Sequence, residues 1–386
     1  MADIYENALL TIAATAAEDS SGGLFSDTSS PFSPRQLKTS ALHVVQVKNV
    51  WDPFQSPRVP FGRSPLLERA WVFQERRLST RVVHFTDLGL VWECCSMRKS
   101  EAGHVNDDWS NEAVARKFLS NIPFKQHIAD TALSWRQTVM EYSRLHLTHI
   151  RDRLPALAAI VKRTMRSRPA DEYIAGMWMS SLPQDLLWLS RDEIRETPEI
   201  TAPSWSWASV ASGVFFLTKT FCFIRANDVT YCNVGPSQLG HAVGASIVLQ
   251  GHSFTAPVNV LQKESPTLGF QYRFDVPNQG LFTNDSFNSW SFIQDLKLAT
   301  ESQAGGVVGA VSILFLGHRY DSRRAWYGLV LKEVAPNVHE RIGICMIWHP
   351  RTSPRVLRKA RFQDNLDFRI NHQAIFELPI RSFRII

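Results

Sequence analysis

The sequence lacks the common catalytic fingerprints and any long apolar run. It contains no G-x-x-x-x-G-K-[ST], G-x-G-x-x-G, G-x-S-x-G or H-E-x-x-H pattern, so phosphate-loop, dinucleotide-fold, nucleophile-elbow and zinc-protease chemistry have no support. No apolar stretch approaches the roughly 18 residues that a membrane-spanning helix needs, and no signal peptide is recognisable. We therefore expect neither secretion nor membrane insertion.

Cysteine is scarce and scattered. The chain has 5 cysteines, none of them in a C-x-x-C pair, and an odd, sparse set is typical of free thiols in a reducing compartment. The sequence thus predicts a cytoplasmic protein without a disulfide framework, and it predicts no metal site and no cofactor. The cysteines are Cys94, Cys95, Cys222, Cys232 and Cys345.

The composition is that of an ordinary globular protein. Hydrophobic residues make up 44% and charged residues 20% of 386 positions, which argues against disorder and leaves room for two or three domains. The formal net charge is +6, and the last 36 residues hold eight basic and three acidic side chains, nearly the whole excess. Such a segment either attracts nucleic acid or an anionic membrane, or it forms a solvated face. Because the rest of the chain is nearly neutral, we do not expect nucleic-acid binding.

The first residues read like the middle of a domain. Ile4, Tyr5 and Ala8 fit the last turn of an amphipathic helix, and the apolar run Leu9–Ala14 predicts a strand buried on both faces of a parallel sheet. Such a strand needs neighbours on either side. We therefore expect a central strand here, and a chain that lacks the N-terminal half of this domain.

A helix and a hairpin follow a Pro- and Ser-rich loop. Pro65 precedes a helix that places Leu67, Ala70, Trp71 and Gln74 on one face. Strands are then predicted at Arg81–Phe85 and Leu90–Cys94, and two-residue alternation puts Leu90, Trp92 and Cys94 on one face of the second strand.

The period then becomes helical, and later strand-like. An apolar stripe predicts a helix over 128–142, Asp152 is expected to cap a second helix whose first turn contains Pro155, and a third helix is predicted at Asp171–Ser180. The fold class predicted is α+β, with divisions at 1–95, a helical region 96–200 and a β-rich domain 201–386. The predicted strands of that domain are Ser246–Gln250, Val307–Leu316, Trp326–Lys332, Arg341–Trp348 and Ala374–Leu378.

Several short blocks occur in a specific order. Residues 4–15 read I-Y-E-N-A-L-L-T-I-A-A-T, residues 69–76 read R-A-W-V-F-Q-E-R, and residues 92–94 read W-E-C. Further blocks are Y-S at 142–143, D-R-L-P-A-L at 152–157, D-L-L-W at 185–188 and A-P-S-W-S-W-A-S at 202–209. Together they resemble the central and closing parts of the heterokaryon-incompatibility (HET) domain and the region that trails it. The family's opening A-L-S-Y-x-W-G and L-W-I-D-x-x-C-I-x-Q blocks are absent.

The resemblance implies a fungal protein of vegetative incompatibility. Its expected function is non-self recognition and programmed cell-death signalling, with an allelic incompatibility factor as protein partner. HET domains have been likened to the Toll/interleukin-receptor fold, some members of which cleave NAD. A NAD glycohydrolase, with Glu75 acting on the nucleotide, is therefore an alternative, and an inert fragment is another. The absence of a complete catalytic motif favours a non-enzymatic role.

The candidate site residues lie in the closing blocks: Trp71, Gln74, Glu75, Arg76, Trp92 and Cys94. A carboxylate between an aromatic ring and a cation can serve as a general base or bind a ribose, which makes Glu75 a weak catalytic candidate. The alternative is a structural role in local ion pairs.

Two other groups of residues allow a functional and a structural interpretation. His84 could pair with Cys94 as a nucleophile and base, or join Cys94 and Cys95 in a zinc site, although adjacent strand residues point to opposite faces. Trp205 and Trp207 alternate with serines, which on a strand would form a stacking platform or a seam of the core, and we favour the core.

Overall fold

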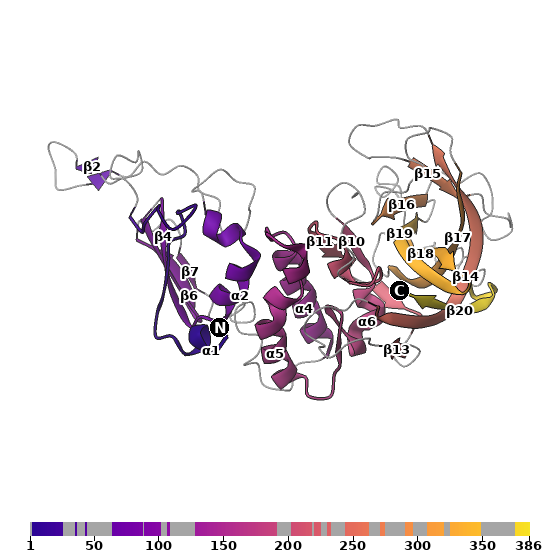
Figure 1. Cartoon of the computed structure of the whole chain (residues 1–386), viewed down its shortest axis with the longest axis horizontal. Helices are drawn as coiled ribbons and strands as arrows, with labels where there is room; N and C mark the ends of the chain where they lie inside the picture. The colour runs from indigo at the N-terminus through magenta and orange to yellow at the C-terminus, as the bar shows by residue number, and fades with distance from the viewer. Residues whose placement is uncertain are drawn as a thin grey trace, which may run out of the picture. The chain divides into compact units, whose positions relative to one another are not determined.

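The fold is mixed α and β, as predicted, and divides into two compact units, Met1–Ala170 (unit 1) and Asp171–Ile386 (unit 2) (Figure 1). The predicted divisions at residues 95 and 200 stay predictions. The computed structural model describes residues 2–25, 35–36, 43–44, 64–87, 89–101, 106–108, 128–190, 202–217, 220–224, 230–232, 244–261, 271–274, 290–295, 307–319, 325–348 and 375–386.

Unit 1 contains a five-stranded sheet with the strand order β1-β4-β5-β6-β7. The strand β1 is parallel to β4, and the other neighbours are antiparallel. The hairpin of β4 and β5 confirms the predicted one, and Gly89 in its turn has a φ of 108°, which favours glycine. The strands are β1 (Thr11–Ala13), β4 (Arg81–Thr86), β5 (Gly89–Cys94), β6 (Met97–Ser100) and β7 (Asn106–Asp108), with a separate pair β2 (Arg35–Gln36) and β3 (His43–Val44).

Helix α2 lies along one face of this sheet (Figure 1), and α1, α4 and α5 contact α2. The helices of unit 1 are α1 (Ala2–Asn7), η1 (Pro65–Glu68), α2 (Ala70–Leu78), α4 (Ile128–Tyr142), η2 (Ile150–Asp152), η3 (Pro155–Leu157) and α5 (Ala158–Ser167). None of the helices in the part of the chain that is described is long and apolar enough to cross a membrane.

The prediction of a central strand at Leu9–Ala14 is wrong. The strand is only three residues long, stands at the edge of the sheet and pairs with β4 alone among the described strands. The side chains of Leu9 and Ile12 are 81% and 59% exposed. A continuous apolar run does not by itself show that a strand is buried, because burial depends on which elements lie beside the strand, and β1 has β4 as its one neighbour among the described strands. Because the strand is not buried on both faces, the argument from burial for a missing N-terminal half has no support.

The two helices predicted from apolar stripes are present. In α4 the residues Ala132, Trp135 and Val139 are buried, which confirms the stripe. The second helix differs in detail: two 3-10 turns precede α5, and Asp152 accepts a hydrogen bond from Trp71 and does not cap a helix.

The third predicted helix, Asp171–Ser180, is absent. This segment forms a hairpin of β8 (Tyr173–Ile174) and β9 (Met177–Trp178), followed by η4 (Met179–Ser181) and α6 (Leu182–Asp185). Ala175 and Gly176 form the turn with φ angles of 42° and 95°, and positive φ at both positions is the geometry of a two-residue hairpin turn. An alanine in this conformation is uncommon, so sequence alone favoured a helix.

Unit 2 is built on a nine-stranded sheet that closes on itself. Five strands, β17, β18, β19, β20 and β14, pair in that order, and β14 pairs again with β17 (Figure 1). The strands are β12 (Thr220–Cys222), β13 (Thr230–Cys232), β14 (Ser246–Leu261), β15 (Gln271–Phe274), β16 (Trp290–Gln294), β17 (Val307–Arg319), β18 (Ala325–Ala335), β19 (Val338–Trp348) and β20 (Ile380–Ile385), beside a separate pair β10 (Trp188–Ser190) and β11 (Val214–Phe216). Four of the five predicted strands are confirmed.

The fifth strand, predicted at Ala374–Leu378, is wrong. Ala374 lies outside the described residues. Ile375 and Phe376 form a helical turn, which the backbone N–H of Leu378 closes by donating to the carbonyl of Ile375 at 3.1 Å. The strand β20 begins only after Pro379, which cannot donate a ladder hydrogen bond.

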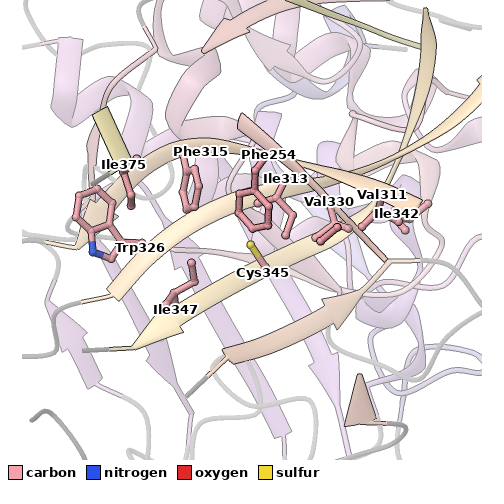
Figure 2. Close-up of a cluster of buried hydrophobic side chains, with 11 residues drawn as sticks. Phe254, Val311, Ile313, Phe315, Trp326, Val330, Ile342, Cys345, Ile347 and Ile375 are labelled. Carbon is pink, nitrogen blue, oxygen red and sulfur yellow. The ribbon is translucent and has the colours of Figure 1, made fainter. Parts of the chain in front are cut away.

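A hydrophobic core of unit 2 lies on one face of β14, β17, β18 and β19. Figure 2 shows the side chains of Phe254, Phe315 and Cys345 gathered there among aliphatic residues of β17, β18 and β19. Gly328 leaves the space that this packing needs, because a Cβ on it would lie 2.8 Å from Ile313 Cγ2 and 3.1 Å from Cys345 Sγ. Burial raises the pKa of the Cys345 thiol to about 12, as expected of an inert core cysteine.

Candidate functional site

The R-A-W-V-F-Q-E-R block forms helix α2, and its polar side chains bond to different elements of unit 1. Trp71 Nε1 donates to Asp152 Oδ2 at 3.2 Å, and Gln74 Oε1 accepts from the backbone N–H of Ala159 at 3.4 Å. The Gln74 side chain is buried and satisfies an amide in the first turn of α5, which has no partner within its own helix. The D-R-L-P-A-L block therefore supports α2 directly.

Glu75 binds the first block of the sequence. It accepts a hydrogen bond from the Tyr5 hydroxyl on α1, and burial, followed by this hydrogen bond and the charge of Glu75, raises the pKa of Tyr5 to about 12. The side chain of Glu75 is half-buried. The contact joins residues that are 70 positions apart and that belong to two different blocks of the resemblance.

Arg76 leads into a buried polar network on the same side of the sheet. Its Nε donates to Glu93 Oε2 at 2.8 Å, and His84 Nε2 lies 3.0 Å from the same oxygen. On the other side of the imidazole ring, His84 Nδ1 lies 2.9 Å from Thr15 Oγ1. His84 and Glu93 are 1% and 3% exposed, and Arg98, also buried, stands directly opposite Glu93 on β6.

The hydrogen-bond roles follow from the chemistry of the groups. A carboxylate can only accept, so the histidine ring donates from Nε2 to Glu93. In the neutral ring, Nδ1 then accepts from the Thr15 hydroxyl. In the charged ring, Nδ1 donates, and that hydroxyl can turn to the carbonyl of Ala13 at 3.4 Å. Each protonation state of His84 thus has a satisfied arrangement in the network.

The order hydroxyl, imidazole and carboxylate is that of a catalytic triad, but the site is closed. Thr15, which would be the nucleophile, is 0% exposed, so no substrate reaches its oxygen in this structure. The network connects β4, β5, α2 and the segment that follows β1. Four side chains meet there, those of Thr15, His84, Glu93 and Arg76, and the charge of Glu93 is paired with that of Arg76.

The network was not predicted, although the sequence contained a signal for it. Once the hairpin of β4 and β5 is known, alternation places His84 and Glu93 on the same face of neighbouring strands. Thr15 and Arg76 could not be placed in this way, because their positions depend on contacts between segments far apart in the chain.

The structure separates His84 from the cysteines with which it was considered. Cys94 lies on the opposite face of the hairpin, where its Sγ is 3.4 Å from Ser96 Oγ, and Cys95 Sγ contacts the carbonyl of Thr80 at 3.7 Å. Burial raises the pKa of Cys94, but hydrogen bonds from Ser96 and Met97 outweigh it and leave the pKa below its usual value. Within the described ranges no group of three His, Cys, Asp or Glu side chains is arranged to hold a metal ion.

In unit 2 the tryptophans of the A-P-S-W-S-W block pack in the core. Trp205 and Trp207 are both 0% exposed, and they lie in a turn and in the 3-10 helix η5 (Trp207–Ser209), so the predicted strand is wrong. Trp207 Nε1 donates to the carbonyl of Gly176 at 2.8 Å, and Trp188 Nε1 donates to the carbonyl of Trp205 at 2.9 Å. The packing interpretation is confirmed, and a stacking platform is excluded by burial.

A buried ion pair stands beside these tryptophans. Arg341 is 0% exposed, and its Nε donates to Asp295 Oδ2 at 2.6 Å. Its Nη1 and Nη2 donate to the carbonyls of Leu186 and Trp188 at 2.6 and 2.7 Å, and the guanidinium lies 3.6 Å from the centroid of the Trp188 ring. Burial raises the pKa of Asp295, while the charge and hydrogen bond of Arg341 act against that rise. The D-L-L-W block is thus fixed to β19.

Unit 1 is therefore an α+β module in which the short helix α2 bonds to the sheet and also contacts α1, α4 and α5. Residues 1–75 match the family described as Heterokaryon incompatibility protein (HET), so this segment is similar to a HET domain. The match ends at Glu75 and includes Tyr5, its hydrogen-bond partner. Comparisons with curated proteins and with solved structures gave no match.

Proposed function

We propose that this chain is a fungal heterokaryon-incompatibility protein that acts in the cytoplasm in non-self recognition and cell-death signalling. In this proposal it works by contact with a protein partner, the allelic incompatibility factor, and has no catalysis of its own. The HET-family match at residues 1–75 supports the class of function. The contact between Glu75 and Tyr5 is the observation that favours signalling over catalysis.

Glu75 is the residue on which the two functions differ. A general base must be free to take a proton from a substrate or a water. Here Glu75 accepts a hydrogen bond from a neighbouring tyrosine, and its neighbours Gln74 and Arg76 bond to α5 and β5. This pattern supports a role in holding α1 against α2. NAD cleavage remains the alternative, and it requires Glu75 to exchange Tyr5 for a substrate.

The test combines growth arrest with product formation. The full chain is expressed in a fungal host as wild type, Glu75→Gln and Tyr5→Phe, and growth is scored against the amount of soluble protein. We expect wild-type expression to arrest growth, both variants to lower the melting temperature, and arrest to fall only in proportion to lost protein. Tyr5→Phe is the matched control, since it removes the same hydrogen bond and keeps the carboxylate.

The enzymatic alternative predicts different results. The purified wild-type chain would release nicotinamide from NAD. Glu75→Gln would lower the rate of release by roughly 10²–10⁴-fold, whereas Tyr5→Phe would retain it. Those results would place the glycohydrolase first. A chain that leaves growth unchanged at high soluble expression would instead support an inert fragment.

A further inference from the structure

One face of the unit 1 sheet is apolar and turned away from α2. Thr11 Oγ1 lies 2.8 Å from Ser79 Oγ at the end of α2, and Arg76 of α2 bonds to Glu93. The side chains on the same sheet face as Thr11 and Glu93 therefore point towards that helix. The alternate residues form the opposite side, which we call the outer sheet face. Its apolar members are Ile12, Val83, Phe85, Leu90, Trp92, Cys94 and Met97.

The outer sheet face is exposed. Ile12 is 59%, Met97 42% and Leu90 38% exposed, and Val83, Phe85 and Trp92 are half-buried. Phe25, 84% exposed, packs edge-on against Phe85 with ring centroids 5.6 Å apart and extends the face. An antiparallel sheet that meets water usually carries polar residues on that side. A contiguous apolar patch of several hundred Å² is typical of an interaction site.

The geometry of the face suits a helix. The row Ile12, Val83 and Trp92 crosses three neighbouring strands, a width of about 10 Å at the usual strand spacing. That width equals the diameter of one α-helix with its side chains, about 10 Å. The same sheet already carries a helix, α2, on its other side, and apolar sheet faces are generally buried by a second layer.

The charges beside the apolar row select the partner. Arg81 is exposed and lies opposite Cys94, and Lys99 is exposed and lies opposite Trp92, so both cations belong to the outer sheet face. The exposed Glu101 lies beside Leu90, at one end of the face, where its carboxylate accepts from the backbone N–H of Leu90. A second copy meeting this face with its own would bring like charges into one interface, which is unfavourable. Helix α5 of a second copy is also unsuitable, because it carries Lys162, Arg163 and Arg166. A partner with acidic side chains is complementary.

We propose that the outer sheet face docks an amphipathic helix of another protein, with acidic residues on either side of its apolar stripe. The proposal deepens the signalling function, on which it rests for its biological meaning, by naming the chemistry of the partner. It also gives Trp92 of the W-E-C block a role: Glu93 joins the buried network, while Trp92 lies in the centre of the docking face.

The binding test uses a synthetic helical peptide of about five turns with a leucine stripe flanked by glutamates. A second peptide keeps the stripe and replaces the glutamates by lysines. Fluorescence anisotropy with the full chain at low salt measures both dissociation constants. We expect the glutamate peptide to bind at least about tenfold more tightly, and the difference to shrink at high salt, where exposed charges are screened.

Variants locate the binding. Ile12→Asp and Phe25→Asp should weaken the glutamate peptide at least about tenfold without lowering the melting temperature, since both side chains are exposed in the folded chain. Phe221→Asp is the control, because Phe221 is an exposed aromatic of unit 2 whose exposed fraction, 61%, is close to the 59% of Ile12. Reversing both charges, Arg81→Glu with Lys99→Glu, should transfer the preference to the lysine peptide.

Several outcomes would overturn the inference. Equal affinities for the two peptides, binding that survives Ile12→Asp, or equal loss with Phe221→Asp would each exclude this face as an acidic-helix site. Sedimentation that shows a dimer of the chain, lost on Phe25→Asp, would assign the face to self-association. Growth arrest that persists with Phe25→Asp would contradict the docking inference and leave the proposed function intact.

Discussion

The substitution Asp295→Asn should destabilise unit 2 strongly while leaving its shape unchanged. The change removes the negative charge that faces Arg341, a guanidinium that is 0% exposed. Breaking one side of a buried ion pair typically costs 3–5 kcal/mol, because the remaining charge stays away from water. Arg341 keeps its bonds to the carbonyls of Leu186 and Trp188, so we expect the lower end of this range, about 3 kcal/mol.

Calorimetry of the full chain measures this effect. For a unit of the size of Asp171–Ile386, 1 kcal/mol lowers the melting temperature by roughly 2–4 °C, so we expect the transition of unit 2 to fall by about 6–12 °C. The control is Glu141→Gln, which breaks the pair with Arg77. Because Glu141 is 49% exposed, that change should cost less than about 1 kcal/mol.

A double variant separates the pair from its surroundings. Asp295→Leu combined with Arg341→Met removes both charges, and an apolar replacement of a buried pair is often neutral or stabilising. Two carbonyls then lose their donors, at a cost of about 1–3 kcal/mol each. We expect the double variant to be more stable than the sum of the single changes predicts. A cost below about 1 kcal/mol for Asp295→Asn, or additive single and double changes, would refute a buried and coupled pair.

Three further predictions concern packing and reactivity. Trp71→Ala should lower the free energy of unfolding measured in urea by about 2–3 kcal/mol. This is less than for a fully buried tryptophan, because Trp71 is half-buried, although it also donates to Asp152. A loss under about 1 kcal/mol would show that the ring hardly packs. Gly328→Ala should lower the free energy of unfolding of unit 2 by about 1–3 kcal/mol, since its Cβ would overlap Ile313 and Cys345. An unchanged unfolding midpoint would contradict the packing described. Iodoacetamide should modify Cys94 before Cys95, at a pH below the usual thiol range, because hydrogen bonds lower the pKa of Cys94. Tandem mass spectrometry of the proteolytic peptides locates each modified thiol, and Cys345 should react only after unfolding.

The sequence was most informative where one element decides the pattern. The hairpin at 81–94 and the buried stripe of α4 were predicted, because alternation and the helical period act within a few residues. The burial of Trp205 and Trp207 was also predicted from their size and setting, although their backbone is a turn and a 3-10 helix.

The sequence was least informative where the outcome depends on distant segments. Thr15 meets His84 across 69 positions, and Asp295 meets Arg341 across 46, and no local period records either pairing. The exposure of Ile12 likewise depends on which strands stand beside β1. The hairpin at Tyr173–Trp178 was missed because an alanine with positive φ is rare, and propensity favoured a helix.

The closed ring of unit 2 can form only late in synthesis. The strand β20, Ile380–Ile385, pairs with β14 and touches β19, so the ring remains open until these six residues have left the ribosome. Pairings between such distant segments form slowly, whereas the β4–β5 hairpin of unit 1 needs only neighbouring residues. During translation, unit 1 can therefore fold while the strands of unit 2 wait with unpaired edges, the state in which a chaperone is most needed.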